Sequence, residues 1–166
     1  ADVTYDYNAR NELTRMSDGV GTTTFDYTPS GLFQSEDGPF ASDQVNYQYN
    51  AARLRSQLTL VQPGGSWTQQ YNYDNAERLT SILTGIGTFS YRYPNGTQNL
   101  SSSSWLWEQL TLPGGPSIRQ SHDTLARLTA TELRNSGNTV LNRHRYQFNP
   151  RHQRSRQTFL AGNYVD

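Results

Sequence analysis

The sequence predicts an all-β fold built from antiparallel β-hairpin repeats. Pairs of aromatic residues separated by one residue recur along the chain, and this spacing places both rings on one face of a strand. A short polar segment with turn chemistry follows each pair, and a second alternating run follows the turn. No segment combines helical periodicity with capping residues. We therefore expect one long meander of hairpins.

The clearest hairpin lies in residues 71–83. Tyr71 and Tyr73 share one face of its first strand. Residues 74–77 begin with Asp and Asn, whose side chains can hydrogen-bond the backbone two residues further on. Leu79 and Leu83 then lie on one face of the returning strand.

The same unit recurs, and we call the second ring of each pair its anchor aromatic. The pairs are Tyr5/Tyr7, Phe25/Tyr27, Tyr47/Tyr49, Tyr71/Tyr73, Tyr91/Tyr93 and Tyr146/Phe148. A degenerate copy has His122 in the anchor position, and successive anchors lie 20 to 29 residues apart. This is the signature of a repeat protein with loops of variable length. We expect the rings to stack as a ladder across adjacent strands.

Turn residues delimit the strands at both ends of the hairpins. Polar segments follow the anchors, and glycine-containing segments such as 18–21, 62–66, 84–87 and 113–116 close the other ends. In chain order, the expected strands are 2–7, 12–17, 22–27, 32–35, 44–49, 54–61, 67–73, 79–83, 88–93, 105–112, 118–123, 128–134, 139–149, 155–161 and 164–166. Residues 125–134 could also form a short helix, but the repeat register favours a turn and a strand.

Three segments carry a resemblance to a known family. Residues 7–14 read Tyr-Asn-Ala-Arg-Asn-Glu-Leu-Thr, residues 73–81 read Tyr-Asp-Asn-Ala-Glu-Arg-Leu-Thr-Ser, and residues 122–129 read His-Asp-Thr-Leu-Ala-Arg-Leu-Thr. They resemble the RHS/YD repeat, usually written Tyr-Asp-x-x-Gly-Arg-Leu-Thr, although the glycine is clearly kept only at Gly31. The repeat occurs in bacterial RHS polymorphic toxins, in shell subunits of insecticidal toxin complexes and in teneurins.

The resemblance implies a fold, partners and a location. Members of the family coil the sheet into a spiral that closes as a hollow shell, so the chain would be an arc of such a wall. Its partners would be the rest of its own shell and an enclosed toxin domain. The expected location is secreted or at the cell surface of a bacterium. Residues 1–166 are expected to be one stretch of about seven repeats from a longer chain, because both ends fall inside the repeat pattern.

Composition excludes several classes of protein. The chain has no Cys, which excludes disulfide scaffolds, thiol catalysis and Cys-ligated zinc. No apolar run is long enough to span a membrane. All 14 basic residues are Arg and balance 14 acids. We expect a thin, aromatic-rich β-structure with much wetted surface.

No residue is predicted to be catalytic or to bind a cofactor or metal, and the chain is not expected to be an enzyme. Ser121, His122 and Asp123 have triad chemistry, but consecutive strand residues point to opposite faces and cannot converge. His122 also occupies an anchor position, which favours packing. The three histidines show no spacing typical of metal ligands.

Two features leave alternatives open. Residues 133–165 contain six arginines and no acid, which could bind nucleic acid, an anionic glycan or an acidic cargo. The favoured interpretation is an edge that neighbouring parts of a shell neutralise, so nucleic-acid binding is not favoured. Trp67, Trp105 and Trp107 are candidate glycan contacts, or they are packing residues.

The expected function is a structural wall segment that encapsulates or displays a toxin or effector module. The alternative is a carbohydrate-binding or adhesion module.

Overall fold

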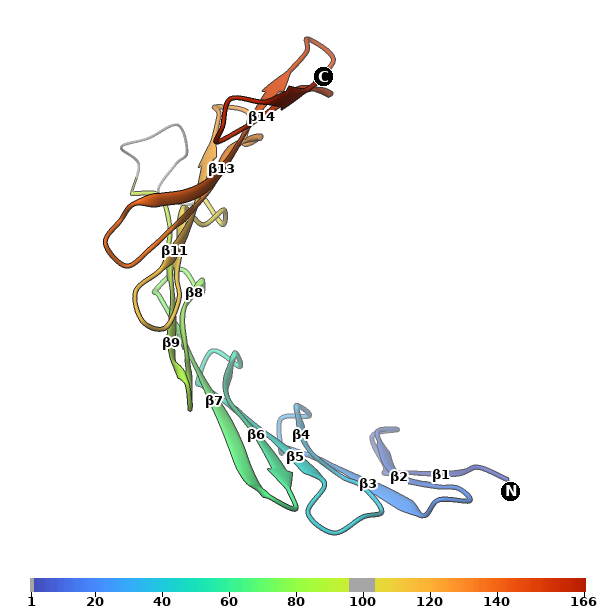
Figure 1. Ribbon diagram of the computed structural model, residues 1–166. Coiled ribbons are helices and arrows are strands. Elements are labelled where there is room, and N and C mark those ends of the chain that lie inside the picture. The colour runs from blue at the N-terminus through green and yellow to red at the C-terminus, as the bar shows by residue number, and fades with distance from the viewer. Residues whose placement is uncertain (1, 96–103) are drawn as a thin grey trace. The chain divides into compact units, whose positions relative to one another are not determined.

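The computed structural model describes residues 2–95 and 104–166, and within them all regular structure is β (Figure 1). In chain order the strands are β1 (Thr4–Tyr7), β2 (Leu13–Ser17), β3 (Thr22–Tyr27), β4 (Phe33–Asp37), β5 (Gln44–Tyr49), β6 (Arg55–Gln62), β7 (Gly65–Tyr73), β8 (Leu79–Thr84), β9 (Gly87–Arg92), β10 (Gln109–Thr111), β11 (Ser117–His122), β12 (Leu128–Arg134), β13 (Val140–Phe148), β14 (Arg154–Phe159) and β15 (Tyr164–Val165).

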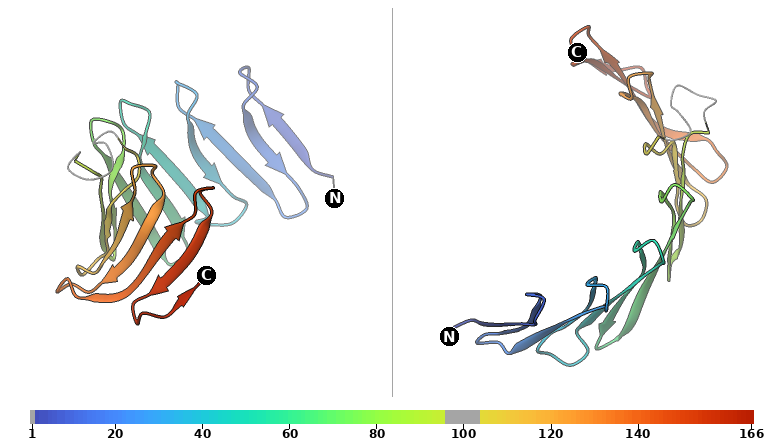
Figure 2. Two further views of the ribbon diagram at one scale, coloured as in Figure 1. Left: turned by 90° about the horizontal axis from the view of Figure 1, so that it is seen from above. Right: turned by 180° about the vertical axis from the view of Figure 1, so that it is seen from behind.

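The strands form one 15-stranded sheet in which each strand neighbours the strand before it and the strand after it in the sequence. The predicted fold class, an all-β antiparallel meander, is therefore confirmed. The chain divides into two compact units. Unit 1 comprises Ala1–Asn72 with Leu83–Gly85, and unit 2 comprises Tyr73–Ile82 with Ile86–Asp166. Within each unit, successive hairpins follow one another in a single layer (Figure 2).

Several strand boundaries differ from those expected, most of them by one or two residues. β4 continues to Asp37, and β6 and β7 run on until only Pro63 and Gly64 separate them, because a two-residue turn lets the ladder extend to its last pair, Gln62 and Gly65. Residues 105–108 are not part of β10. The strand with which they would pair, β9, ends at Arg92. It is soon followed by Pro94, which has no backbone N–H to donate to a neighbouring strand.

A β-bulge recurs at the same place in the repeats. Register shifts lie immediately before the anchor positions Tyr7, Tyr27, Tyr49, His122 and Phe148. The residue left unpaired is the Thr of the motif in two repeats, and its hydroxyl donates to the opposite strand: Thr14 to the Asp6 carbonyl at 3.2 Å and Thr129 to the Ser121 carbonyl at 3.0 Å. A bulge strengthens the local twist of the strand pair. The Thr of the motif thus satisfies a carbonyl at the bulge.

The described residues contain no buried hydrophobic side chain. Apart from Pro94, the buried residues among them are the polar residues Thr23, Ser35, Ser117 and His122. Large apolar side chains are instead partly or largely exposed, Ile86 at 79% and Trp105 at 66% among them. A single sheet has no second layer against which to bury them, so the hairpins are held together by contacts within and between repeats.

Candidate functional site: the repeat turns and the two faces of the sheet

The turns that follow the anchors share one hydrogen-bonded geometry. In the six that the structure describes, the N–H of the first residue donates to the carbonyl of the fifth, and the N–H of the fourth donates to the carbonyl of the first. The first residues are Asn8, Thr28, Asn50, Asp74, Asp123 and Asn149. In all six, a side-chain oxygen of the first residue also accepts from the N–H of the fifth. A short polar side chain at this position therefore adds a further hydrogen bond to the turn.

The fourth residue of each of these turns lies in the left-handed region. Its φ is +79° at Gly31 and between +60° and +64° at the other five positions, Asn11, Arg53, Glu77, Ala126 and His152. This is the position of the glycine in the YD motif. Left-handed backbone costs a residue with a Cβ roughly 1–2 kcal/mol. Five of the turns therefore carry strain that the repeat consensus avoids.

Replacing Ala126 by glycine should stabilise its hairpin. We expect a gain of about 0.5–1 kcal/mol, since relief of the left-handed strain exceeds the added entropy of the unfolded chain. Hydrogen exchange of β11 and β12 in the full-length protein would measure it. The matched reverse change, Gly31→Ala, should weaken the β3–β4 hairpin, because its Cβ would also lie 3.2 Å from the Glu12 Oε1 atom. Faster exchange in Ala126→Gly would contradict this account.

The arginine that follows the strained position links one repeat to the next. Arg78 binds the Asp74 carboxylate at 2.8 Å, and its guanidinium carbon lies 4.5 Å from the ring centre of Tyr93, the next anchor. Arg127 repeats this arrangement with Asp123 at 2.7 Å and the ring of Phe148 at 4.7 Å. A guanidinium group can do both because its edge donates hydrogen bonds while its flat face stacks on a ring.

These pairs change the acidity of the two carboxyl groups. The hydrogen bond from the Arg78 side chain lowers the pKa of Asp74. Burial alone would raise the pKa of Asp123, but hydrogen bonds from the backbone and side chain of Arg127 outweigh it and lower the pKa overall. Both carboxyl groups are therefore held in the ionised form that the arginine requires.

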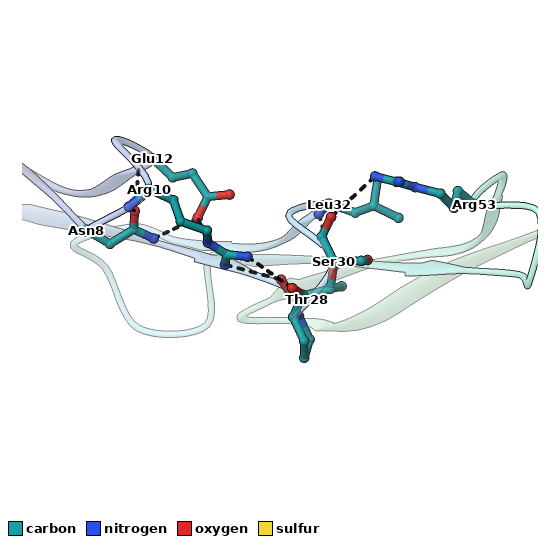
Figure 3. Close-up of polar contacts among 8 residues, drawn as sticks. Asn8, Arg10, Glu12, Thr28, Ser30, Leu32 and Arg53 are labelled. Atoms are coloured by element: carbon teal, nitrogen blue, oxygen red, sulfur yellow. Dashed lines mark hydrogen bonds and ion pairs between the residues drawn. The ribbon is translucent and has the colours of Figure 1, made fainter.

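Arginine side chains also connect neighbouring turns to one another, mostly by donating hydrogen bonds to backbone carbonyl groups (Figure 3). Arg10 donates to the Pro29 carbonyl at 3.0 Å, and Arg53 donates to the Ser30 carbonyl at 3.3 Å. The turn at 28–32 thus receives one arginine from the turn before it and one from the turn after it. In unit 2, Arg78 donates to the Ser104 carbonyl at 2.9 Å, and Arg127 lies 3.0 Å from His152 Nδ1.

Anchor tyrosines supply a second connection between repeats. The Tyr49 hydroxyl donates to the Phe33 carbonyl at 2.7 Å, and the Tyr93 hydroxyl donates to the Leu79 carbonyl at 3.0 Å. Each acceptor lies at the start of the returning strand of the preceding hairpin. Both bonds use the hydroxyl group, which a phenylalanine at the same position would lack.

The expected ladder of anchor rings in adjacent strands is wrong in one respect. Equivalent aromatics lie two strands apart, because the returning strand of each hairpin separates them. In unit 1 the gap is filled by Phe33 in β4, whose ring centre lies 5.6 Å from that of Tyr27 and 5.4 Å from that of Tyr47. In β6, Arg55 stacks on Tyr47 at 4.6 Å. Phe33 in the returning strand β4 therefore provides the aromatic contact with the next repeat, whereas Arg55 and Tyr47 lie within one hairpin.

The sheet has two chemically different faces, which the register defines row by row. One aromatic-face row of unit 1 is Phe25, Glu36, Val45, Leu60 and Trp67, and the polar-face row beside it is Asp26, Ser35, Asn46, Thr59 and Thr68. In unit 2 the corresponding rows are Tyr91, Leu110, Ile118, Leu133 and Asn142 on the aromatic face, and Arg92, Gln109, Arg119, Glu132 and Arg143 on the polar face. The sequence pattern predicted that the aromatic rings share one face, but it did not identify the opposite, polar face as a candidate binding surface.

The three candidate glycan contacts lie in different surroundings. Trp67 belongs to unit 1, is 41% exposed and lines a hollow of about 390 Å³ with Gln70 and Leu83. Trp107 belongs to unit 2 and packs edge-on against Tyr91 at 6.4 Å. Trp105, in the same unit, is 66% exposed. Trp107 therefore has an aromatic neighbour, and Trp105 presents a largely exposed side chain.

The Ser-His-Asp sequence in β11 does not form a reactive arrangement. Ser121 is exposed, whereas His122 is buried, and burial lowers the pKa of His122 despite the opposing charges of Asp123 and Glu108. Among the described residues there is no group of three or more side chains suited to hold a metal ion. A search of the same residues found no helix with the length and apolar character to cross a membrane.

Comparison with known proteins identifies the fold. No protein-family model matches the chain, and no curated protein matches it. The crystal structure of TcdB2-TccC3-TEV, in contrast, is similar over 95% of this chain, with a TM-score of 0.72 and 15% sequence identity. This chain has the fold of that structure. It spans 9% of the matched chain, and the fold expected from the YD-type repeats is confirmed.

Two further structures match with lower TM-scores. The crystal structure of TcdB2-TccC3 covers 95% of this chain and 12% of its own, with 10% identity and a TM-score of 0.38. A Tc holotoxin pore of Photorhabdus luminescens with a mutated TccC3 covers 95% of this chain and 11% of its own, with 10% identity and a TM-score of 0.34. These scores are too low to support an argument about the fold.

Proposed function

We propose that the chain is a structural wall segment of a large RHS/YD-repeat protein that encapsulates or displays a toxin or effector module. The observation that carries this proposal is a single-layer sheet with two different faces and no buried hydrophobic side chain among the described residues. Such a sheet separates two spaces and offers each a different surface. Its partners would be the rest of its own wall and an enclosed toxin domain.

The contacts between repeats support this role. Arginine bridges and tyrosine hydroxyl bonds connect several hairpins to their neighbours, so a wall can be extended by adding hairpins. The matched crystal structure, whose name includes TcdB2 and TccC3, has this fold. By analogy, residues 1–166 are one stretch of a longer bacterial protein that is secreted or displayed at the cell surface.

A closed wall should protect one face of the sheet from large reagents. Gln69 and Gln70 are neighbours in β7 and point to opposite faces. We would replace each by cysteine in the full-length protein, in a background without other reactive thiols. Both positions should react with a small maleimide, whereas a polyethylene-glycol maleimide should label only one of them until the protein is unfolded. Equal labelling of both by the large reagent would show an open sheet and end the proposal.

Glycan binding remains the second candidate function, favoured by the hollow beside the exposed ring of Trp67. Ser66, Thr68 and Gln70 also line this hollow, but the register places Thr68 on the polar face and Trp67 on the aromatic face, so the support for this function is the exposed ring of Trp67. A glycan array would detect specific binding, which Trp67→Ala should remove while Trp105→Ala, in unit 2, leaves it unchanged. The wall function alone predicts no specific glycan.

A further inference from the structure

The polar face of unit 2 carries more positive than negative side chains. The arginines on it are Arg92, Arg119, Arg134, Arg143, Arg145 and Arg156, and the acids are Glu108, Glu132 and Asp166. The polar face of unit 1 has the opposite balance, with Arg15 against Asp6, Asp26 and Asp37. The excess of arginine therefore belongs to one face of one unit.

The centre of this surface is the polar-face row that runs across β9–β13. Register places Arg92 opposite Gln109 and Gln109 opposite Arg119. Glu132 then lies opposite both Arg119 and Arg143. Since neighbouring strands are about 4.8 Å apart, the arginines in this row recur at about 10 Å.

The two glutamates of this surface, Glu108 and Glu132, are largely buried and pair with its arginines. The side chains of Glu108 and Glu132 are only 14% and 18% exposed; that of Arg92 is 60% exposed, that of Arg143 is 28% exposed, and that of Arg134 is 19% exposed. Glu132 accepts from Arg134 and lies 4.0 Å from Arg143. A hollow of about 240 Å³ above them is lined by Arg92, Arg119 and Arg134 together with the Ser121 region.

Arg119, at the middle of the row, is held by a neutral group. Its Nε donates to the Gln109 side-chain oxygen at 3.0 Å, which orients the guanidinium group but leaves its charge in place. No ion pair joins Arg119 to a carboxylate among the described residues. Guanidinium groups bind carboxylates through paired hydrogen bonds, so the row presents an oriented receptor for carboxylates.

We propose that this row binds an acidic polypeptide segment in the polyproline II conformation, lying across the strands with a carboxylate at every third residue. A polyproline II chain has three residues per turn and rises about 3.1 Å per residue, so side chains three residues apart lie on one side of it and recur at about 9 Å, close to the spacing of the arginines. The proposal concerns unit 2 by itself and would stand even if the wall function were wrong.

Single-stranded nucleic acid fits this surface less well. Its binding proteins combine a basic groove with aromatic rings on which the bases stack. Here Tyr91 and Tyr146 lie on the opposite face of β9 and β13 from Arg92 and Arg143. Glu108 and Glu132 also interrupt the positive charge that a continuous polyanion would require. An acidic polypeptide can place neutral residues over these glutamates.

The test is fluorescence anisotropy with the full-length protein and a labelled peptide that has Glu at every third position between Gly and Ser. Binding should be strong at low salt and weaken as salt is raised. Arg119→Gln and Arg143→Gln should each weaken it about tenfold. The matched control, Arg151→Gln, removes the same charge from an exposed turn residue and should change binding less than about twofold. A peptide with Gln for Glu should not bind.

Three outcomes would overturn the proposal. The first is no binding of the acidic peptide, and the second is an equal loss in Arg151→Gln, which would indicate non-specific attraction. The third is tighter binding of a single-stranded DNA of equal charge that depends on the same arginines. Hydrogen exchange of β11–β13 checks the fold of each variant. If Gln destabilises the sheet, Arg119→Lys and Arg143→Lys should restore the fold and most of the binding.

Discussion

Truncation of Phe33 to alanine should destabilise the β3–β6 region by about 2–3 kcal/mol, a value below that for a fully buried phenylalanine because this side chain is only half-buried. The ring contacts Tyr27 in its own hairpin and Tyr47 in the next. Its removal would leave both tyrosines without their aromatic neighbour in β4, and paired rings contribute beyond the area they bury. One substitution therefore weakens two repeats together.

Hydrogen exchange of the full-length protein would measure this loss strand by strand. Amides of β3 to β6 should exchange faster in Phe33→Ala, whereas those of β11 to β14 should be unchanged. Phe40→Ala is the matched control, because Phe40 is 65% exposed in the loop before β5 and should cost less than about 0.5 kcal/mol. Equal effects of the two substitutions would show that Phe33 does not join the repeats.

Strand positions could be predicted because they depend on local pattern. Period-two aromatic pairs such as Tyr47 and Tyr49 fix a strand and its face, and an Asn or Asp after the anchor fixes the turn. Of residues 164–166, expected as an incoming strand, Tyr164 and Val165 form β15. Boundaries were less accurate where the turn was shorter than assumed, as at Pro63 and Gly64.

Contacts between repeats could not be predicted, since they depend on which strands are neighbours. The anchor spacing suggested that Tyr27 and Tyr49 lie in adjacent strands, but each returning strand intervenes. The stacking of Arg78 on Tyr93 joins residues 15 positions apart that only the folded register brings together. Nothing in the local sequence around Arg78 indicates this ring.

The arginine-rich segment 133–165 shows the same limit. It was considered as a single patch, yet its members point to both faces of the sheet. Arg154 stacks on Tyr146 on the aromatic face at 3.9 Å, whereas Arg156 is held by Asp166. The arginines that form the polar-face row include Arg92 and Arg119, which lie outside the segment. A linear window cannot detect a row that runs perpendicular to the strands.

Replacement of Arg127 by alanine should loosen the turn at 123–127 and its contact with the next repeat. Arg127 is 28% exposed, binds the Asp123 carboxylate, lies over the ring of Phe148 and lies beside His152. Removing it leaves Asp123 without its cation and Phe148 without its covering group. We expect amides of β11–β13 to exchange about tenfold faster or more. Arg127→Lys should recover part of the loss, since an ammonium group keeps the charge but cannot stack as a plane.

The effect of Arg127→Ala should also depend on pH in a defined direction. The pKa of Asp123 is lower in the folded chain than its ordinary value of 3.8. The pair with Arg127 therefore contributes its full stability above about pH 4, and this contribution is lost as the pH falls through the folded-state pKa. Thermal unfolding of the full-length protein, followed by circular dichroism, should show a clear difference in melting temperature between wild type and Arg127→Ala at pH 7 and a smaller one at pH 3.

The control Arg151→Ala, in the neighbouring turn, should match the melting temperature of the wild type at both pH values. A difference that persists unchanged at pH 3 would assign the stabilisation to the stacking on Phe148 alone, and no difference at pH 7 would show that the motif arginine does not join the repeats.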